Sequence, residues 1–138
     1  MKPYMHRVQY YETDMMGITH HSNYIRWMEE ARIDFMDQLG FPYSRMEQEG
    51  VMSPVKSVSC EYTHPSAFGE EICISVSVDS FNGVVLKLAY EMKNPAGQTV
   101  CSAASEHVFL NREGRLVRLK RTLPEFCAAV EGVMKPAE

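Results

Sequence analysis

The sequence predicts an α+β fold in which a curved, antiparallel, five-stranded sheet wraps around one long central helix. Apolar residues between Tyr24 and Leu39 recur at helical spacing. Most of the remaining chain alternates apolar and polar residues in the manner of strands. Because the apolar stripe of the helix is wide, the helix needs cover on most sides, and a sheet that curves around it supplies that cover.

Length, charge and cysteine usage narrow the class of protein. The 138 residues predict a single domain, residues 1–138, and no apolar run approaches the roughly 20 residues of a membrane span. The N-terminus leads straight into a strand pattern, so we expect no signal peptide. A net charge of −4 argues against nucleic acid as the main partner. Four widely spaced cysteines indicate reduced residues of a cytoplasmic protein: Cys60, Cys73, Cys101 and Cys127.

The central helix has a predicted beginning and end. Ser22 is expected to cap its N-terminus, because a serine hydroxyl can accept a free amide of the first turn. Gly40 is expected to end the helix, and Pro42 prevents its continuation. The apolar face consists of Tyr24, Ile25, Trp27, Met28, Ala31, Phe35, Met36 and Leu39.

Strand patterns occupy both sides of this helix. Residues 4–11 predict a first strand with Tyr4, His6, Val8 and Tyr10 on one face. After a short helix over 43–48, we expect a meander of four strands, with a two-residue hairpin at Asn82-Gly83. Thr122 to Glu125 predicts a capping box that opens a C-terminal helix. The first strand of the meander covers residues 51–63, where Pro54 marks an edge or bulge. The second covers 70–79, the third carries Leu86, Leu88, Tyr90 and Met92 on one face, and the fourth covers 98–110.

Two stretches carry a family resemblance that spans about residues 5–120. The segment ETDMMGITHHSNYIRWMEEAR resembles the signature of the hotdog-fold acyl-CoA thioesterases, specifically the 4-hydroxybenzoyl-CoA thioesterase and YbgC-like group. Met15-Met16 departs from it, since the family often has small residues or proline there. The matching positions are Asp14, Gly17, Ile18, Asn23, Tyr24, Glu29 or Glu30, Ala31 and Arg32, and, in the later stretch CEYTHPSAFGEEICI, Tyr62, Pro65, Gly69 and Glu70.

The resemblance implies a hydrolytic site at the start of the central helix. Thioester hydrolysis needs a base or nucleophile near the acyl carbon and a positive potential at the carbonyl oxygen. Free amides at a helix N-terminus supply that potential. By resemblance, Asp14 is the catalytic carboxylate and the backbone amide of His21 polarises the carbonyl. Asp14 has two open roles, direct attack on the carbonyl or activation of a water.

Other residues of the signature have predicted roles. By resemblance, the candidate substrate contacts are Met16, Gly17, Ile18, Asn23 and Tyr24. For Asn23 we favour the alternative role of supporting the start of the helix. The His21 side chain has two alternative roles: it forms a hydrogen bond with the substrate or with Asp14, or it is purely structural.

Several neighbouring residues have alternative interpretations. We expect no metal at His20 and His21, because adjacent side chains point apart and no third ligand has zinc spacing. Glu29 and Glu30 are rival carboxylates, and Arg32 has the helical spacing to pair with Glu29.

A basic cluster follows the last predicted strand. Coenzyme A carries phosphates that attract such charges, so Arg118, Lys120 and Arg121, together with Arg115, are candidates to bind them. The alternative is a solvated face that precedes a helix.

The sequence therefore predicts an acyl-CoA thioesterase that releases coenzyme A and a small or medium carboxylic acid. No cofactor is expected, because coenzyme A is part of the substrate. A non-catalytic acyl-CoA-binding hotdog module and an acyl-carrier-protein thioesterase are the alternatives. A sheet of this length has edges that can accept another strand, and the resemblance implies a homodimer or tetramer with the site at the seam between subunits.

Overall fold

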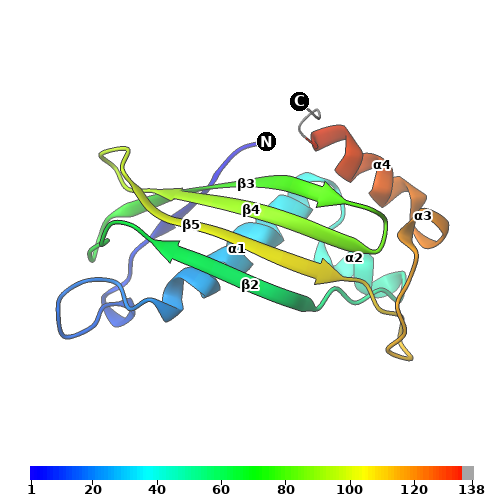
Figure 1. Ribbon diagram of the computed structural model, residues 1–138, viewed down its shortest axis with the longest axis horizontal. Helices are drawn as coiled ribbons and strands as arrows, with labels where there is room; N and C mark the ends of the chain where they lie inside the picture. The colour runs from blue at the N-terminus through cyan, green and yellow to red at the C-terminus, as the bar shows by residue number, and fades with distance from the viewer. Residues whose placement is uncertain (135–138) are drawn as a thin grey trace.

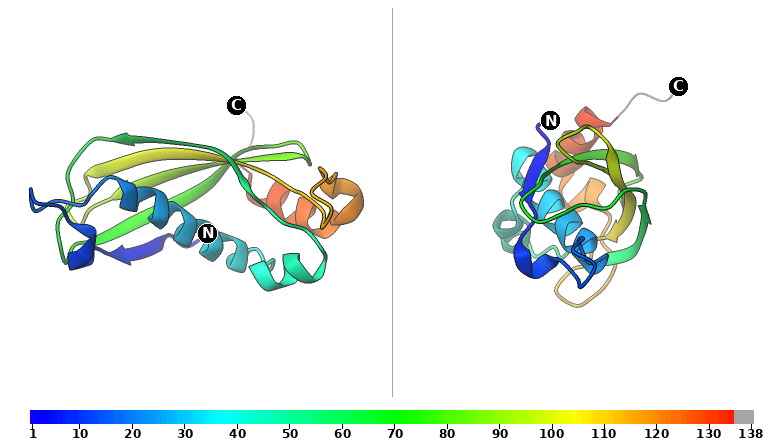
Figure 2. Two further views of the ribbon diagram at one scale, coloured as in Figure 1. Left: turned by 90° about the horizontal axis from the view of Figure 1, so that it is seen from below. Right: turned by 90° about the vertical axis from the view of Figure 1, so that its left-hand side faces the viewer.

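In the computed structural model, which describes residues 1–134, one antiparallel five-stranded sheet wraps around the helix α1 (Ser22–Gln38) (Figure 1). The end-on view of Figure 2 shows the strands curled around α1. The predicted fold class is therefore confirmed. The strands are β1 (Tyr4–Arg7), β2 (Val55–Tyr62), β3 (Glu71–Phe81), β4 (Val85–Lys93) and β5 (Thr99–Val108), and the smaller helices are η1 (Tyr10–Glu12), α2 (Tyr43–Gln48), α3 (Leu119–Thr122) and α4 (Pro124–Val133).

The strand order is β1-β3-β4-β5-β2. The predicted meander of four strands is wrong at its first member, because β2 crosses over to pair with β5 instead of β3. As a result β2 is an edge strand, and seven of its eight side chains are exposed. No helix within residues 1–134 is long and apolar enough to cross a membrane.

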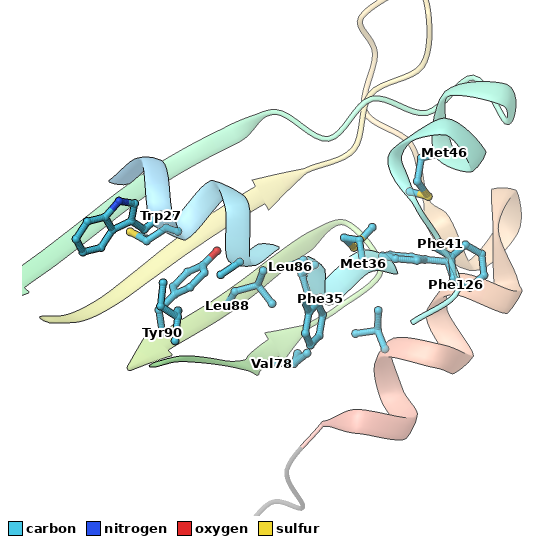
Figure 3. Close-up of a cluster of buried hydrophobic side chains, with 14 of the residues drawn as sticks. Trp27, Phe35, Met36, Phe41, Met46, Val78, Leu86, Leu88, Tyr90 and Phe126 are labelled. Carbon is cyan, nitrogen blue, oxygen red and sulfur yellow. The ribbon is translucent and has the colours of Figure 1, made fainter. Parts of the chain in front are cut away.

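The core lies between α1 and the concave face of the sheet. The Phe35 side chain of α1 lies near Val78 of β3 and Leu86 of β4 (Figure 3), and Trp27, Leu88 and Met92 are fully inaccessible. All four inward positions predicted for β4 are buried. Beyond the end of α1, the Phe126 ring of α4 meets Phe41 and Phe109 edge to face, with centroids 5.3 and 5.6 Å away. Helix α4 thus closes the end of the core that the sheet leaves open.

The C-terminus of α1 ends as predicted, but its N-terminus does not. Gly40 adopts φ +85°, and its N–H donates to Asp37 O while that of Phe41 donates to Met36 O. The N-cap is His21, so the prediction of Ser22 is wrong. Ser22 lies inside the first turn, where the His20 ring replaces a capping side chain by accepting the Ser22 N–H at 3.2 Å.

Three other local predictions are wrong at element ends. The first strand stops at Arg7, and the chain turns into η1, which leaves Tyr10 exposed. The β3–β4 loop has three residues, because β4 begins only at Val85; the Asn82 side chain accepts the amides of Val84 and Val85. The C-terminal helix is capped by Leu123 without a side-chain bond, so the capping box at Thr122 is absent.

Burial also differs from the predicted pattern at Ile25, which is 44 % exposed. The four cysteines are free, as predicted, and Cys101 and Cys127 are buried.

Replacing Phe126 by alanine should destabilise the protein by about 3–5 kcal/mol, because a fully buried ring with three aromatic neighbours leaves a cavity. The control is Phe68→Ala, since the Phe68 side chain is 60 % exposed. Chemical denaturation measures both. Equal effects of the two substitutions would show that α4 does not close the core.

Candidate functional site

A tight turn between η1 and α1 carries Asp14. The Asp14 N–H donates to Ile18 O at 2.8 Å, and the Gly17 N–H donates to Asp14 O at 3.0 Å. Gly17 has φ +80°, a conformation that side chains disfavour, so a glycine belongs at this point of the turn. Asp14 Oδ1 accepts the Met16 N–H at 2.8 Å, while Oδ2 has no hydrogen-bond partner within residues 1–134. A hydrogen bond therefore fixes the orientation of the carboxylate through Oδ1 and leaves Oδ2 available to another partner.

The N-terminus of α1 faces the same space as Asp14. His21 precedes the first helical residue with φ −57° and ψ −27°, and its backbone N–H has no acceptor in the described part of the chain. Such an N–H lies at the positive end of the helix dipole. A cleft of about 380 Å³ is lined by Asp14, Met16, Ile18, Thr19, His21, Tyr24, Tyr62, Thr63, His64 and Pro65.

Two tyrosines form one wall of the cleft. Tyr24 is buried, and its hydroxyl lies 2.8 Å from Ser66 Oγ, which is in turn 2.6 Å from Thr19 Oγ1. The Tyr62 ring lies 5.3 Å from that of Tyr24, and its hydroxyl donates to His21 O at 3.5 Å. Partial burial and the neighbouring Cys60 thiol raise the pKa of Tyr62 to about 12, so this phenol is neutral at physiological pH.

The carboxylate of Glu12 anchors the turn from behind. It is only 4 % exposed, and it accepts hydrogen bonds from Trp27 Nε1 at 2.6 Å and from the Gln9 N–H at 2.8 Å. The backbone oxygen of Glu12 accepts the Asn23 side-chain amide and the His20 N–H, both at 2.8 Å. These bonds tie the chain just before Asp14 to the first turns of α1.

His6 extends this anchor to the surface. Its Nε2 shares a hydrogen bond of 2.8 Å with Glu12 Oε1, and its Nδ1 lies 2.9 Å from Glu30 Oε2. The His6 ring also packs on the indole of Trp27, with centroids 4.5 Å apart. β1, η1 and α1 are thereby joined around one buried carboxylate.

The structure separates the predicted site residues into two groups. Asp14, Met16, Ile18, His21 and Tyr24 line the cleft together. Gly17 shapes the turn, and Asn23 lies behind it with its side-chain amide donating to Glu12 O and His20 O.

The two histidines and the rival carboxylates lie differently from the prediction. The rings of His20 and His21 stack at 4.3 Å, so the expectation that they point apart is wrong. No hydrogen bond joins His21 to Asp14 within residues 1–134. Glu30 Oε2 lies 2.9 Å from His6 Nδ1, while Glu29 is exposed on α1 away from the cleft. Glu29 and Arg32 form no ion pair in the described structure, contrary to the prediction from their spacing.

Sequence reasoning missed the side chains that complete the cleft and those that support it. The run from Thr63 to Ser66 closes one side, and Glu12 supports the turn. A signal existed for the first group, because these residues directly follow an exposed strand in a stretch that already matched the resemblance. For the buried Glu12, the sequence offers only one local signal, the spacing of Gln9 and Glu12, which is that of a capping box.

The basic cluster lies at the opposite end of the molecule from Asp14. Figures 1 and 2 show α3 at one end of the sheet and the N-terminus of α1 at the other. Arg118 and Arg121 line a separate pocket of about 440 Å³, and the Lys120 side chain packs over Gly83. A single chain therefore does not bring these charges to its own Asp14.

Comparison with known proteins identifies the family. The model of the thioesterase-like superfamily matches residues 8–132. YneP of Bacillus subtilis (strain 168), provisionally named an acyl-CoA thioesterase, is 36 % identical over 129 residues, which cover 93 % of this chain and 94 % of YneP. A protein of Aquifex aeolicus (strain VF5), provisionally named an esterase, is 32 % identical over 122 residues, covering 88 % of this chain and 94 % of that protein.

A solved structure agrees with the sequence comparison. A DHNA-CoA thioesterase from Staphylococcus aureus superposes with a TM-score of 0.91 at 28 % identity, over 96 % of this chain and 89 % of that one. The fold and these relatives thus define the class of protein as a hotdog-fold thioester hydrolase. The chain belongs to the thioesterase-like superfamily.

The Glu12 anchor should make stability depend on acidity. Burial opposes ionisation of Glu12, but hydrogen bonds from His6, Gln9 and Trp27 outweigh it and hold the pKa of Glu12 below its usual value of 4.5. A carboxylate with a lowered pKa contributes stability above pH 4.5, and this is lost as the pH falls through the folded-state pKa.

We therefore expect Glu12→Gln to lower the free energy of unfolding by about 2 kcal/mol at pH 7, with a smaller difference from wild type at pH 3. Urea denaturation at both pH values measures this, with Glu47→Gln on an exposed helix face as the control. A difference that stays constant between pH 7 and pH 3 would contradict the assignment of an ionised, hydrogen-bonded Glu12.

Proposed function

We propose that this chain is an acyl-CoA thioesterase that cleaves a small or medium acyl-CoA with the Asp14 carboxylate and the His21 backbone N–H. One observation carries the proposal: a carboxylate oxygen and a helix N-terminal N–H, both without partners in the described structure, line the same cleft. The names of YneP and of the Staphylococcus aureus structure support coenzyme A as the thiol half of the substrate.

The reaction divides between these two groups. As oxygen adds to the thioester carbon, negative charge develops on the carbonyl oxygen, and the His21 N–H at the positive helix end stabilises it. Collapse of this intermediate breaks the C–S bond and releases coenzyme A as a thiolate that takes up a proton. Asp14 either removes a proton from the attacking water or attacks first, forming an anhydride that water then hydrolyses.

The surroundings of Asp14 suit both roles. The Met16 N–H holds Oδ1, so Oδ2 is the oxygen that faces a water or an acyl carbon. Tyr62 is neutral, and its phenol adds no negative charge to the cleft. Met16 and Ile18 supply apolar surface beside the reacting centre. Gly17 and Asn23 act on the substrate indirectly, through the shape of the turn and the start of α1.

The proposed assembly is at least a homodimer formed through β2. This edge is open, and its exposed residues include Val55, Val58 and Tyr62. An exposed apolar edge strand is a template for pairing with another chain. Antiparallel pairing of two β2 strands would bring the basic end of one subunit toward the Asp14 end of its partner. Coenzyme A phosphates would then meet Arg118, Lys120 and Arg121 of the second subunit.

Two further expectations belong to this proposal. The hydrolysis uses side chains, a backbone amide and water, so we expect no cofactor requirement. A cytoplasmic location stays a prediction that rests on the free cysteines.

Asp14→Asn should reduce kcat for acyl-CoA hydrolysis by at least about 100-fold, because amides are neither bases nor nucleophiles at this position. Release of free thiol from a panel of acyl-CoAs and one acyl-carrier-protein thioester measures it, with EDTA present in a parallel series. Asp37→Asn, on an exposed face of α1, is the matched control. Equal turnover by Asp14→Asn and wild type would remove Asp14 from the mechanism.

The outcome on the panel also separates the alternatives. Turnover of the carrier-bound thioester alone would assign an acyl-carrier-protein thioesterase. No turnover of any substrate, with acyl-CoA still bound, would assign a binding module. A rate lost in EDTA would contradict the expectation that no metal takes part.

Sedimentation should give a mass of at least twice the 15.8 kDa chain, and Val58→Asp should shift the protein toward monomer, because a carboxylate would be buried at the β2 seam. Asp79→Asn on β3, away from this edge, is the control. A wild-type monomer at micromolar concentration would exclude the proposed assembly.

A further inference from the structure

A second cavity, of about 220 Å³, lies between α1 and the sheet near the start of β2. Its walls are apolar and comprise Ile25, Met28, Val55 and Val58, with Glu29 and Arg32 also lining it. This volume exceeds the roughly 150 Å³ of an apolar cavity that holds benzene. The cavity is therefore large enough for an aromatic ring or a short aliphatic chain.

The inner lining of this cavity is polar and deeply buried. Tyr90, Ser105 and His107 are 3 %, 4 % and 1 % exposed. The Tyr90 hydroxyl, which points from β4 toward α1 in Figure 3, lies 2.7 Å from Ser105 Oγ, and Ser105 Oγ lies 2.7 Å from His107 Nε2. Three polar side chains thus form one continuous chain of hydrogen bonds.

The chain ends in a nitrogen without a partner. His107 Nδ1 is buried and is the one buried side-chain nitrogen or oxygen within residues 1–134 that lacks a hydrogen bond. Burial, with a smaller effect of the Arg32 charge, lowers the pKa of His107 to about 4, so the ring is neutral at physiological pH. A buried polar atom without a partner is costly, which suggests that a ligand supplies one.

The tautomer of His107 decides which atom that ligand must offer. Both contacts of Ser105, with the Tyr90 hydroxyl and with His107 Nε2, are compatible with either direction of donation. When Tyr90 donates to Ser105 and Ser105 donates to Nε2, the single proton of the neutral ring resides on Nδ1. Nδ1–H is then a free donor that requires an acceptor oxygen.

The same geometry argues against a second nucleophile. Ser105 and His107 resemble two members of a catalytic triad, but among residues 1–134 the third is missing, because no carboxylate there contacts Nδ1. A ring with a pKa of about 4 is also a weak base at physiological pH. Binding, and not covalent catalysis, fits the arrangement.

The topology relates this cavity to the reacting centre of a second subunit. Tyr62 at one end of β2 lines the Asp14 cleft, and Val55 and Val58 at the other end line the second cavity. In an antiparallel β2 pair centred on the middle of the strand, Tyr62 lies opposite Val55 of the partner subunit. The Asp14 cleft of one subunit and the second cavity of its partner then adjoin.

We propose that this cavity receives the acyl group of a thioester held at the partner's Asp14, and that His107 Nδ1–H selects acyl groups with a neutral hydroxyl or carbonyl oxygen remote from the thioester. This inference rests on the proposed function and names its substrate class.

Paired substrates test the selection. Hydrolysis rates are compared for benzoyl-CoA with its 3-hydroxy and 4-hydroxy derivatives, and for hexanoyl-CoA with 6-hydroxyhexanoyl-CoA. In the wild type, kcat/KM of at least one hydroxylated substrate should exceed that of its parent by about tenfold, the size of one hydrogen bond. In His107→Phe this ratio should fall toward one. Ser102→Ala, exposed on the same strand, should keep the wild-type ratio.

The tautomer gives a second readout that does not depend on turnover. Nitrogen-15 NMR of labelled histidine should show His107 protonated at Nδ1 and not at Nε2 at pH 7. Protonation at Nε2 would overturn the inference. If His107→Phe does not fold, His107→Leu, which also lacks the donor, replaces it in the rate comparison.

Different results would overturn the selection by His107 and the proposed thioesterase function. Hydrolysis of all substrates with wild-type ratios near one would overturn the selection by His107 and leave the thioesterase standing. If nothing is hydrolysed, calorimetry on the same acyl-CoA pairs decides. A tenfold preference in Kd that His107→Phe abolishes would support the cavity, and equal affinities would overturn it.

Discussion

The buried carboxylate of Glu12 holds the candidate site in place. Its side chain bonds the Trp27 indole in the middle of the core, and its backbone oxygen bonds Asn23 and His20 at the start of α1. Asp14 is only two residues further on. A short, doubly tethered connection leaves the catalytic candidate little freedom relative to the helix end. Such pre-organisation is what stabilisation of a developing oxyanion requires.

Features that depend on neighbours in sequence could be predicted. The helical stripe of α1, its end at Gly40 and the alternation in β4 are local patterns that tertiary structure did not override. The crossing of β2 to the far edge could not be predicted, since it depends on pairing between segments some forty residues apart. The early end of β1 has a similar origin. The buried Glu12 carboxylate accepts the Gln9 N–H, and the chain continues as η1 instead of as a strand.

The candidate site also has one part that neighbours in sequence form and another that segments far apart in the chain form. Asp14 and His21 could be proposed from the sequence because a turn and a helix start adjoin there, and the resemblance pointed to both. Ser66 and Tyr62 reach the cleft from another part of the chain, through contacts with Thr19 and Tyr24. The second cavity has a similar character, since His107 and Ser105 meet α1 only in the fold. Edge strand β2 contributes residues to both hollows, so subunit pairing would be part of the chemistry in the proposed dimer.

The central claim is that one thioester carbonyl binds between Asp14 and the free N–H of His21. A crystal structure with a non-hydrolysable acyl-CoA analogue, in which a methylene replaces the thioester sulfur, tests it most directly. The account predicts the carbonyl oxygen about 3 Å from the His21 nitrogen and the carbonyl carbon facing Asp14 Oδ2. A carbonyl bound elsewhere, with Asp14 facing only solvent, would contradict it.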